Sequence, residues 1–257
     1  MEYKYIDTHG HLQFEDYDSD RELEIQKMKE SETLGIIVGV DIGSSKQAVK
    51  LAEENEHLFA CVGIHPTYEG EHIDELEELV KHEKVVAIGE CGLDFFRSPK
   101  EVEWDKQKKL FDRQIDLAIK YGKPLMIHAR SANKEIAEIL RERKKEAGDK
   151  LMANLHFFTG TMEEAKAFLD MGFTLSFSGV ITFARDYDEV VRFAPITHIL
   201  TETDSPYATP IPFRGKRNNP RFVSEVVTAL ARIREEDEEE VREIVLNNAK
   251  RVFKLKI

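Results

Sequence analysis

Eight apolar, β-rich segments recur along the 257 residues, and charged stretches with helical periodicity lie between them. Strands that alternate with helices are typical of a parallel sheet with helical crossovers. Eight such units in about 250 residues match a (β/α)₈ barrel. We therefore predict an α/β protein, a single TIM-barrel domain over residues 1–257. The expected strands are YIDTH (5–9), GIIVGVDI (35–42), LFACVGIHP (58–66), KVVAIGECGLD (84–94), KPLMIHAR (123–130), MANLHFF (152–158), FTLSFSG (173–179) and HILTETDSP (198–206).

The expected helices fill the intervals between these strands. Ser44 and Ser45 resemble an N-cap at the start of the second helix. An open doubly wound sheet is the alternative fold, but it usually carries a Gly-rich phosphate loop after its first strand. Neither G-x-G-x-x-G nor a P-loop motif occurs in the chain. The expected helices lie at 19–31, 44–57, 72–83, 101–122, 131–148, 162–172, 186–194 and 221–253, the last as two helices or one broken helix.

The composition is that of a water-soluble globular protein, with 41% apolar and 33% charged residues. No apolar stretch approaches the length of a membrane span, and the first residues lack a secretory signal pattern. We therefore expect a cytoplasmic protein with no membrane partner. The two cysteines, Cys61 and Cys91, are too few for a disulfide framework. The net charge of −12 argues against a broad basic surface that coats nucleic acid, but it leaves room for an enzyme that grips a few phosphates locally.

Histidines and acidic residues gather at the expected C-terminal ends of the strands, where barrels of this class carry their catalytic groups. Residues two apart in a strand share a face, so Asp7, His9 and His11 should project together. His198 begins the last strand and therefore belongs to the opposite end. Imidazoles and carboxylates pack poorly together without cations, and both are metal ligands, so we predict a metal centre. Its candidate ligands are His9, His11, Glu90, His128, His156 and Asp204.

The motifs at these strand ends form an ordered series. They are DTHGH, GIHP, GECGLDFF, IHAR, HFFTG and ETDSPY, followed by PFRGKRNNP. In this series, which runs from the first strand to the last, the chain resembles the TatD family of metal-dependent hydrolases. That family is a branch of the amidohydrolase-like barrels, and its members are described as deoxyribonucleases that use divalent metals.

The resemblance implies a role for each strand-end residue. His9, His11 and Asp204 would bind a first metal ion, His128 and His156 would bind a second, and Glu90 would bridge the two. His65 would contact substrate or phosphate near the site. Two divalent ions about 3.5–4 Å apart repel each other and need an anion between them, which also favours a bridging carboxylate at Glu90. The metal is left open among Zn, Mn, Mg, Fe and Ni.

Four further residues near the strand ends have expected orientations. Glu202 shares the parity of Asp204 and should face the same interior, where it either orients an imidazole from behind or makes a structural polar contact. Asp94 either anchors a loop or caps a turn. Cys91 should point outward to the helices, and Cys61 should fill the barrel interior.

Cationic residues cluster in PIPFRGKRNNP, the segment that follows the last expected strand. Loops after strands seven and eight commonly grip phosphate in such barrels, so Arg214, Lys216 and Arg217 are predicted to bind substrate phosphates, with a solvated charge run as the alternative. Arg130 and Arg97 could add to this grip. The aromatic residues that either stack a base or pack at the rim are Phe14, Phe95, Phe96 and Phe158.

These patterns predict a divalent-metal-dependent hydrolase that cleaves DNA phosphodiester bonds with a metal-activated water. Asp204 would take the proton from that water, and Glu90 would act with it as the bridging carboxylate. The sequence leaves two other classes open. One is a small-molecule amidohydrolase, esterase, lactonase or deaminase on the same two metals, and the other is a metal-stabilised protein without catalytic activity. It implies no obligatory protein partner.

Overall fold

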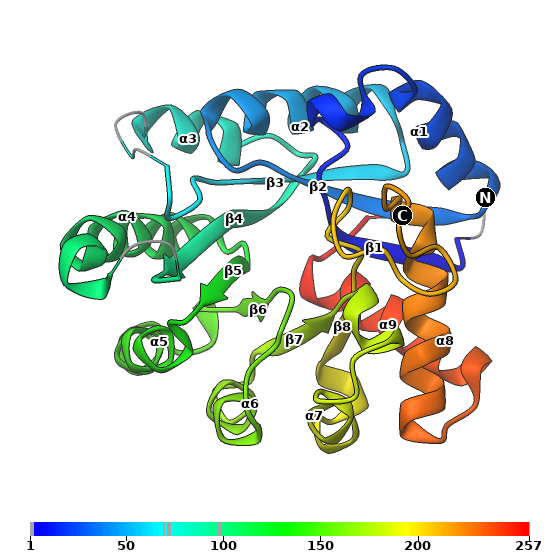
Figure 1. Cartoon of the computed structure of the whole chain (residues 1–257). Coiled ribbons are helices and arrows are strands. Elements are labelled where there is room, and N and C mark those ends of the chain that lie inside the picture. The colour runs from blue at the N-terminus through cyan, green and yellow to red at the C-terminus, as the bar shows by residue number, and fades with distance from the viewer. Residues whose placement is uncertain (1–2, 69, 71–72, 97–98, 257) are drawn as a thin grey trace.

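Eight parallel strands form one sheet in the computed structural model, which describes residues 3–68, 70, 73–96 and 99–256 (Figure 1). The strand order follows the chain from β1 to β8, and every neighbouring pair is parallel. The strands are β1 (Tyr5–Gly10), β2 (Thr33–Val38), β3 (Leu58–Val62), β4 (Val85–Asp94), β5 (Leu125–Arg130), β6 (Ala153–Leu155), β7 (Thr174–Phe177) and β8 (Ile199–Thr201).

The first strand meets the segment after the last one and nearly closes the barrel. Gly10 forms a parallel bridge with Ser205, and the His11 amide donates to the Ser205 carbonyl at 2.8 Å. The Asp204 amide donates to the carbonyl of His9, also at 2.8 Å. The predicted (β/α)₈ barrel is therefore confirmed, and its closure brings two candidate site residues onto adjacent backbone.

Helices surround the strands, as Figure 1 shows. The last predicted helical segment is two separate helices. None of the helices within the described residues is long and apolar enough to cross a membrane. The helices are α1 (Arg21–Glu30), α2 (Ile42–Glu54), α3 (Ile73–Val80), α4 (Lys100–Tyr121), α5 (Asn133–Ala147), α6 (Met162–Leu169), α7 (Asp188–Phe193), α8 (Val223–Arg234) and α9 (Glu238–Val252).

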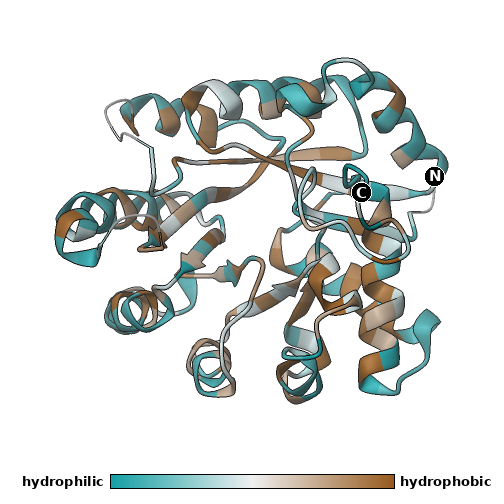
Figure 2. Cartoon of the chain, viewed as in Figure 1, coloured by the Kyte–Doolittle hydropathy of each residue, from teal (hydrophilic) through white to brown (hydrophobic). Residues whose placement is uncertain are grey.

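Two apolar clusters hold the architecture together. The larger lies between strands and helices and includes Cys91, whereas the smaller fills the barrel interior around Cys61, so both cysteines have the expected orientations. Leu246 and Phe253, on and just after α9, pack into the inner cluster. Figure 2 shows hydrophobic residues on the strands and hydrophilic residues on much of the outer helix surface. Polar side chains in the barrel therefore stand out against an apolar interior.

The start of α2 differs from the prediction. Its N-cap is Asp41, whose carboxylate accepts from the Ser44 amide at 2.7 Å, while the Ser44 hydroxyl accepts from the Asp41 amide at 3.0 Å. Ser44 therefore completes a capping box from the third helical position. The expected serine N-cap was wrong because an aspartate three residues earlier caps equally well.

Two glycines let β4 approach β5 closely on both sides of Glu90. Gly89 has φ 148° and Gly92 has φ 136°, where L side chains are strained. A Cβ atom at Gly89 would lie 2.3 Å from the Met126 carbonyl oxygen, and one at Gly92 would lie 2.1 Å from that of His128. The two glycines therefore fix how near Glu90 and His128 come to each other.

Replacing Gly92 with alanine should lower the free energy of unfolding, measured by chemical denaturation. The strained φ alone costs about 1–3 kcal/mol, and the contact with the His128 carbonyl adds to it. Gly43→Ala is the matched control, because its Cβ would make only an ordinary contact of 3.5 Å within α2. Equal losses in both variants would contradict the close-approach explanation.

Candidate metal centre

Residues from five strand ends converge at one end of the barrel. His9 lies in β1, Glu90 in β4 and His128 in β5, while His156 follows β6 directly. Asp204 lies three residues beyond β8 and has a left-handed φ of 52°. His9 and His11 are 0% and 3% exposed, so these imidazoles are not solvated surface groups.

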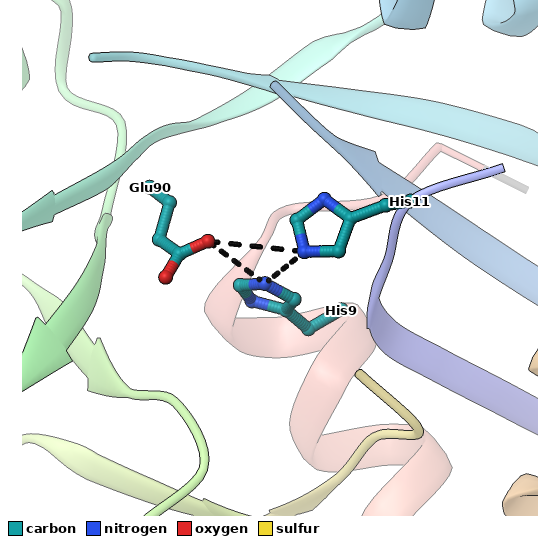
Figure 3. A group of neighbouring side chains, drawn as sticks. All are labelled: His9, His11 and Glu90. Carbon is teal, nitrogen blue, oxygen red and sulfur yellow. Dashed lines mark hydrogen bonds and ion pairs between the residues drawn. The ribbon is translucent and has the colours of Figure 1, made fainter. Parts of the chain in front are cut away.

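His9, His11 and Glu90 form the first part of the cluster (Figure 3). The Nε2 atoms of the two imidazoles lie 3.2 Å apart, and Oε2 of Glu90 lies 3.4 Å from His9 and 3.8 Å from His11. Asp204 completes this group, since its Oδ1 lies 3.4 Å from Nε2 of His11 and 3.9 Å from that of His9. Two nitrogens and two carboxylates therefore face a common point.

The second part of the cluster faces the other oxygen of Glu90. Oε1 lies 2.8 Å from Nδ1 of His128, 3.0 Å from Nε2 of His156 and 3.5 Å from Nε2 of His65. The ligating nitrogens of His128 and His156 are 3.4 Å apart. The carboxylate of Glu90 thus has one set of imidazoles at each oxygen.

The charge state of Glu90 follows from its surroundings. Burial raises the pKa of its carboxyl group, but the imidazoles of His156, His65 and His128 together outweigh burial and hold the pKa well below its usual range. Burial lowers the pKa of His65 to about 4, so that imidazole is neutral near pH 7. An ionised carboxylate therefore lies at the centre of the imidazole cluster.

Each imidazole has one nitrogen that faces away from the cluster. The hydrogen-bond partner of that nitrogen decides whether the other nitrogen keeps its lone pair for a metal ion. Nδ1 of His11 lies 2.7 Å from the Val38 carbonyl oxygen, which can only accept, so the hydrogen resides on Nδ1 and the Nε2 lone pair faces Glu90. Nδ1 of His9 is buried and has no hydrogen-bond partner. Nε2 of His128 lies 3.1 Å from Oδ2 of Asp94.

Glu202 lies behind the second set of imidazoles, completely buried. Its Oε1 lies 3.4 Å from Nδ1 of His156, a close charge contact rather than a well-formed hydrogen bond, since Nδ1 has no hydrogen-bond partner. The same oxygen accepts from the Phe157 amide at 2.7 Å, and the other accepts from the Ser176 hydroxyl. Glu202 therefore touches an imidazole of the cluster from the interior side, where its parity predicted it.

Asp7 does not join the cluster. The register of β1 shifts between Asp7 and Gly10, which breaks the strict alternation of faces. The Asp7 carboxylate instead accepts from the Thr203 amide at 2.8 Å and from its hydroxyl at 2.6 Å. The prediction that Asp7 projects with His9 and His11 was therefore wrong.

Two buried glutamines of α4 hold backbone beside the cluster. The Gln107 amide accepts from the Asp94 N–H at 2.8 Å and donates to its carbonyl at 3.0 Å. Gln114 makes the same pair of bonds, both 2.9 Å, with Ile64, the residue before His65. Neither glutamine was predicted from the sequence, although their seven-residue spacing on one helix was a usable signal.

The predicted cationic residues differ in their surroundings. Arg217 forms a bidentate pair with Asp20 at 2.9 and 2.7 Å, so its guanidinium is already engaged. Arg214 is exposed, lies 4.1 Å above the Phe183 ring and donates to the Thr209 carbonyl at 3.1 Å. Three predicted cations remain besides these. Lys216 and Arg130 are exposed, and Arg97 lies outside the described residues.

The aromatic residues around the cluster also divide. Phe14 stacks on the His11 ring at 4.5 Å between centroids, and Phe96 is 62% exposed under the guanidinium of Arg130. Phe158 is buried in the outer apolar core, and Phe95, partly buried, packs against that core.

Two exposed tyrosines near the cluster were not predicted from the sequence. The amide of Tyr68 donates to the His65 carbonyl, and the amide of Tyr207 donates to that of Asp204, each at 2.9 Å. Their rings are 43% and 55% exposed. A tyrosine three residues after a site residue, in HPTY and DSPY, was the available signal.

The donor set fits a metal ion. Imidazole nitrogens and carboxylate oxygens are the ligands that Zn and other first-row metals prefer. Among the described residues, three groups each bring together ligand atoms that lie within 4.8 Å of one another. They are His9, His11 and Glu90; His9, His156 and Glu202; and His65, Glu90 and His128.

The chain is similar to known metal-dependent hydrolases. A family model described as "TatD related DNase" matches residues 6–254. The uncharacterized metal-dependent hydrolase YabD of Bacillus subtilis is 41% identical over 259 residues, which cover 97% of this chain and 99% of YabD. The uncharacterized metal-dependent hydrolase TatD of Mycobacterium tuberculosis is 36% identical over 97% of this chain and 98% of its own.

A solved structure extends the comparison to three dimensions. The crystal structure of YjjV, a TatD homologue from Escherichia coli K12, superposes with a TM-score of 0.89 at 28% identity and covers 100% of both chains. With the family match over almost the whole chain, this likeness establishes that the protein belongs to the TatD family of metal-dependent hydrolases.

Proposed function

We propose that this metal-dependent hydrolase cleaves phosphodiester bonds of DNA at a centre of two divalent ions. The observation that carries the proposal is the division of the Glu90 carboxylate, with Oε2 facing His9 and Oε1 facing His128 and His156. A carboxylate shared between two ligand sets is what a pair of close cations requires. The family description, "TatD related DNase", favours a DNA substrate.

In this proposal His9, His11 and Asp204 would hold the first ion and His128 and His156 would hold the second, with Glu90 available to both. Bound divalent cations supply positive charge that polarises a phosphodiester and makes water more acidic. His65 is neutral and 3.5 Å from Glu90, and it would contact the substrate beside the second set. Glu202, whose Oε1 lies 3.4 Å from Nδ1 of His156, would help to orient that ring from behind.

Asp204 is proposed to accept the proton of the attacking water. Its backbone amide is tied to the His9 carbonyl, which fixes the start of its side chain relative to the first set. That side chain is 17% exposed, whereas that of Glu90 is 6% exposed. Of the two catalytic carboxylates, Asp204 is therefore the one open to solvent and able to pass a proton on.

Local cations and aromatic rings would hold the DNA, because the net charge of −12 disfavours a general attraction. Arg130, directly above Phe96, and the exposed Arg214 and Lys216 are the proposed phosphate contacts. Tyr68 and Tyr207 offer exposed faces on which bases could stack. Arg217, also predicted to bind phosphate, would first have to release Asp20.

The two-ion centre predicts a metal count. Wild-type protein reloaded after chelation should bind two divalent ions per chain, and either His128→Ala or His156→Ala should lose one of them, as measured by elemental analysis. His198→Ala is the matched control, because His198 precedes β8 at the opposite end of the barrel. Full occupancy in both ligand variants would contradict the ligand assignment.

The phosphate grip predicts a change in substrate affinity. Arg214→Ala combined with Lys216→Ala should raise KM for oligonucleotides and flatten its salt dependence, by a slope of about 0.7–0.9 for each phosphate that the variant no longer neutralises. Lys50→Ala with Lys166→Ala removes the same charge from α2 and α6 and should leave both quantities unchanged. An unaltered KM and salt slope in the loop variant would refute phosphate binding by Arg214 and Lys216.

Asp204→Asn tests the reaction itself. The amide keeps the shape and one ligating oxygen but cannot accept the proton, so turnover should fall about 10²–10⁴-fold. The assay is a substrate panel of DNA oligonucleotides, amides, lactones and nucleobases with excess divalent ion, and metal occupancy is measured alongside the rate. If the fully occupied variant hydrolyses DNA at the wild-type rate, Asp204 is a ligand only. If the wild-type enzyme acts only on the small molecules of the panel, the DNase proposal is rejected.

A further inference from the structure

Asp94 has more contacts than a turn cap needs. It ends β4, four residues after Glu90, and its side chain is only 4% exposed. Oδ1 accepts from the Phe96 amide at 2.9 Å, which is the contact of a turn cap. Oδ2 has a separate partner, Nε2 of His128 at 3.1 Å. The two oxygens of this carboxylate therefore have different partners, a backbone amide for Oδ1 and an imidazole for Oδ2.

The second contact determines what His128 can offer on its other side. An ionised carboxylate only accepts, so Asp94 keeps a hydrogen on Nε2, and a His128 ring that gives up a hydrogen to bind a cation gives it up from Nδ1. Nδ1 is the atom that faces the cluster, 2.8 Å from Oε1 of Glu90. A metal ligand needs that lone pair, and carboxylates behind ligating imidazoles commonly fix it.

The position of Asp94 is itself held firmly. Gln107 of α4 bonds both the amide and the carbonyl of Asp94, and the register of the sheet pairs Asp94 with Arg130, two residues after His128. The backbone of Asp94 is therefore fixed, and its carboxylate could turn away from the imidazole only by giving up the bond from the Phe96 amide. The carbonyl oxygen of Val38 makes the corresponding contact with Nδ1 of His11, although this acceptor is neutral.

We propose that Asp94 is a positioning residue that locks the His128 ring with Nδ1 free to bind the second divalent ion. This inference rests on the two-ion centre proposed above. It assigns to Asp94 no contact with substrate and no part in proton transfer.

Two substitutions of Asp94 separate this role from turn capping. Asp94→Asn keeps an oxygen for the Phe96 amide but presents an NH₂ group to Nε2 of His128, which forces the hydrogen onto Nδ1. Asp94→Ala removes both contacts and leaves the ring free to take either form. A positioning role therefore makes asparagine the worse variant for metal binding, whereas a turn cap alone makes alanine the worse.

The measurements use the full chain. Competition with a chelator dye should show that Asp94→Asn weakens one Zn²⁺ site about 10–100-fold, with a smaller loss in Asp94→Ala. In metal-free protein, ¹⁵N spectra of the histidine rings should show a hydrogen on Nε2 of His128 in wild type, and a hydrogen on Nδ1 alone in Asp94→Asn. Asp237→Asn, which alters a capping carboxylate on α9, is the control and should change neither.

The outcomes separate the two proposals. If wild type binds two ions, and Asp94→Asn binds both with wild-type affinity and an unchanged His128 ring, the role of Asp94 is overturned while the two-ion centre stands. If wild type binds only one ion, the two-ion centre fails, and the ring hydrogen still decides whether Asp94 sets the form of His128. An affinity loss larger in Asp94→Ala than in Asp94→Asn also overturns the proposal.

Discussion

The rest of the site depends on one ionised carboxylate buried among imidazoles. Glu90 would be costly in an apolar barrel by itself, and the nitrogens around both of its oxygens offset that cost. The position of β4, the strand that carries Glu90, is therefore constrained by its neighbours. Glycines on both sides bring β4 against β5, and the buried carboxylates of Glu202 and Asp94 lie behind the imidazoles of His156 and His128. Removing the carboxylate would leave several imidazoles facing one another without an anion between them.

The order of elements and the place of the site could be predicted from the sequence because they follow from periodicity and from barrel geometry. Alternating apolar and amphipathic segments defined the barrel, and the strand-end rule selected His9, Glu90 and His128 from residues far apart in the chain. Membership of the TatD family, inferred from the motifs, is confirmed. The use of DNA and the metal count stay predictions.

What sequence reasoning could not supply depends on local irregularity and on long-range pairing. A register shift in β1 turned Asp7 toward Thr203 instead of the cluster. The partner of Arg217 is Asp20, 197 positions away, and no local pattern marks that pair. The hydrogen positions on the imidazoles likewise follow from what lies behind each ring, such as the Val38 carbonyl, which only the folded chain brings there.

Two glutamines of α4 set the spacing between two backbone segments of the site. Gln107 bonds the backbone of Asp94, and Gln114 bonds that of Ile64. The two glutamines lie seven residues apart on one helix face, so the same helix positions the chain at the ends of β3 and β4. One residue inserted between the glutamines would rotate one of them by about 100° and release its loop. We would therefore expect length changes among relatives to avoid this stretch of α4 and to fall at the exposed turns instead.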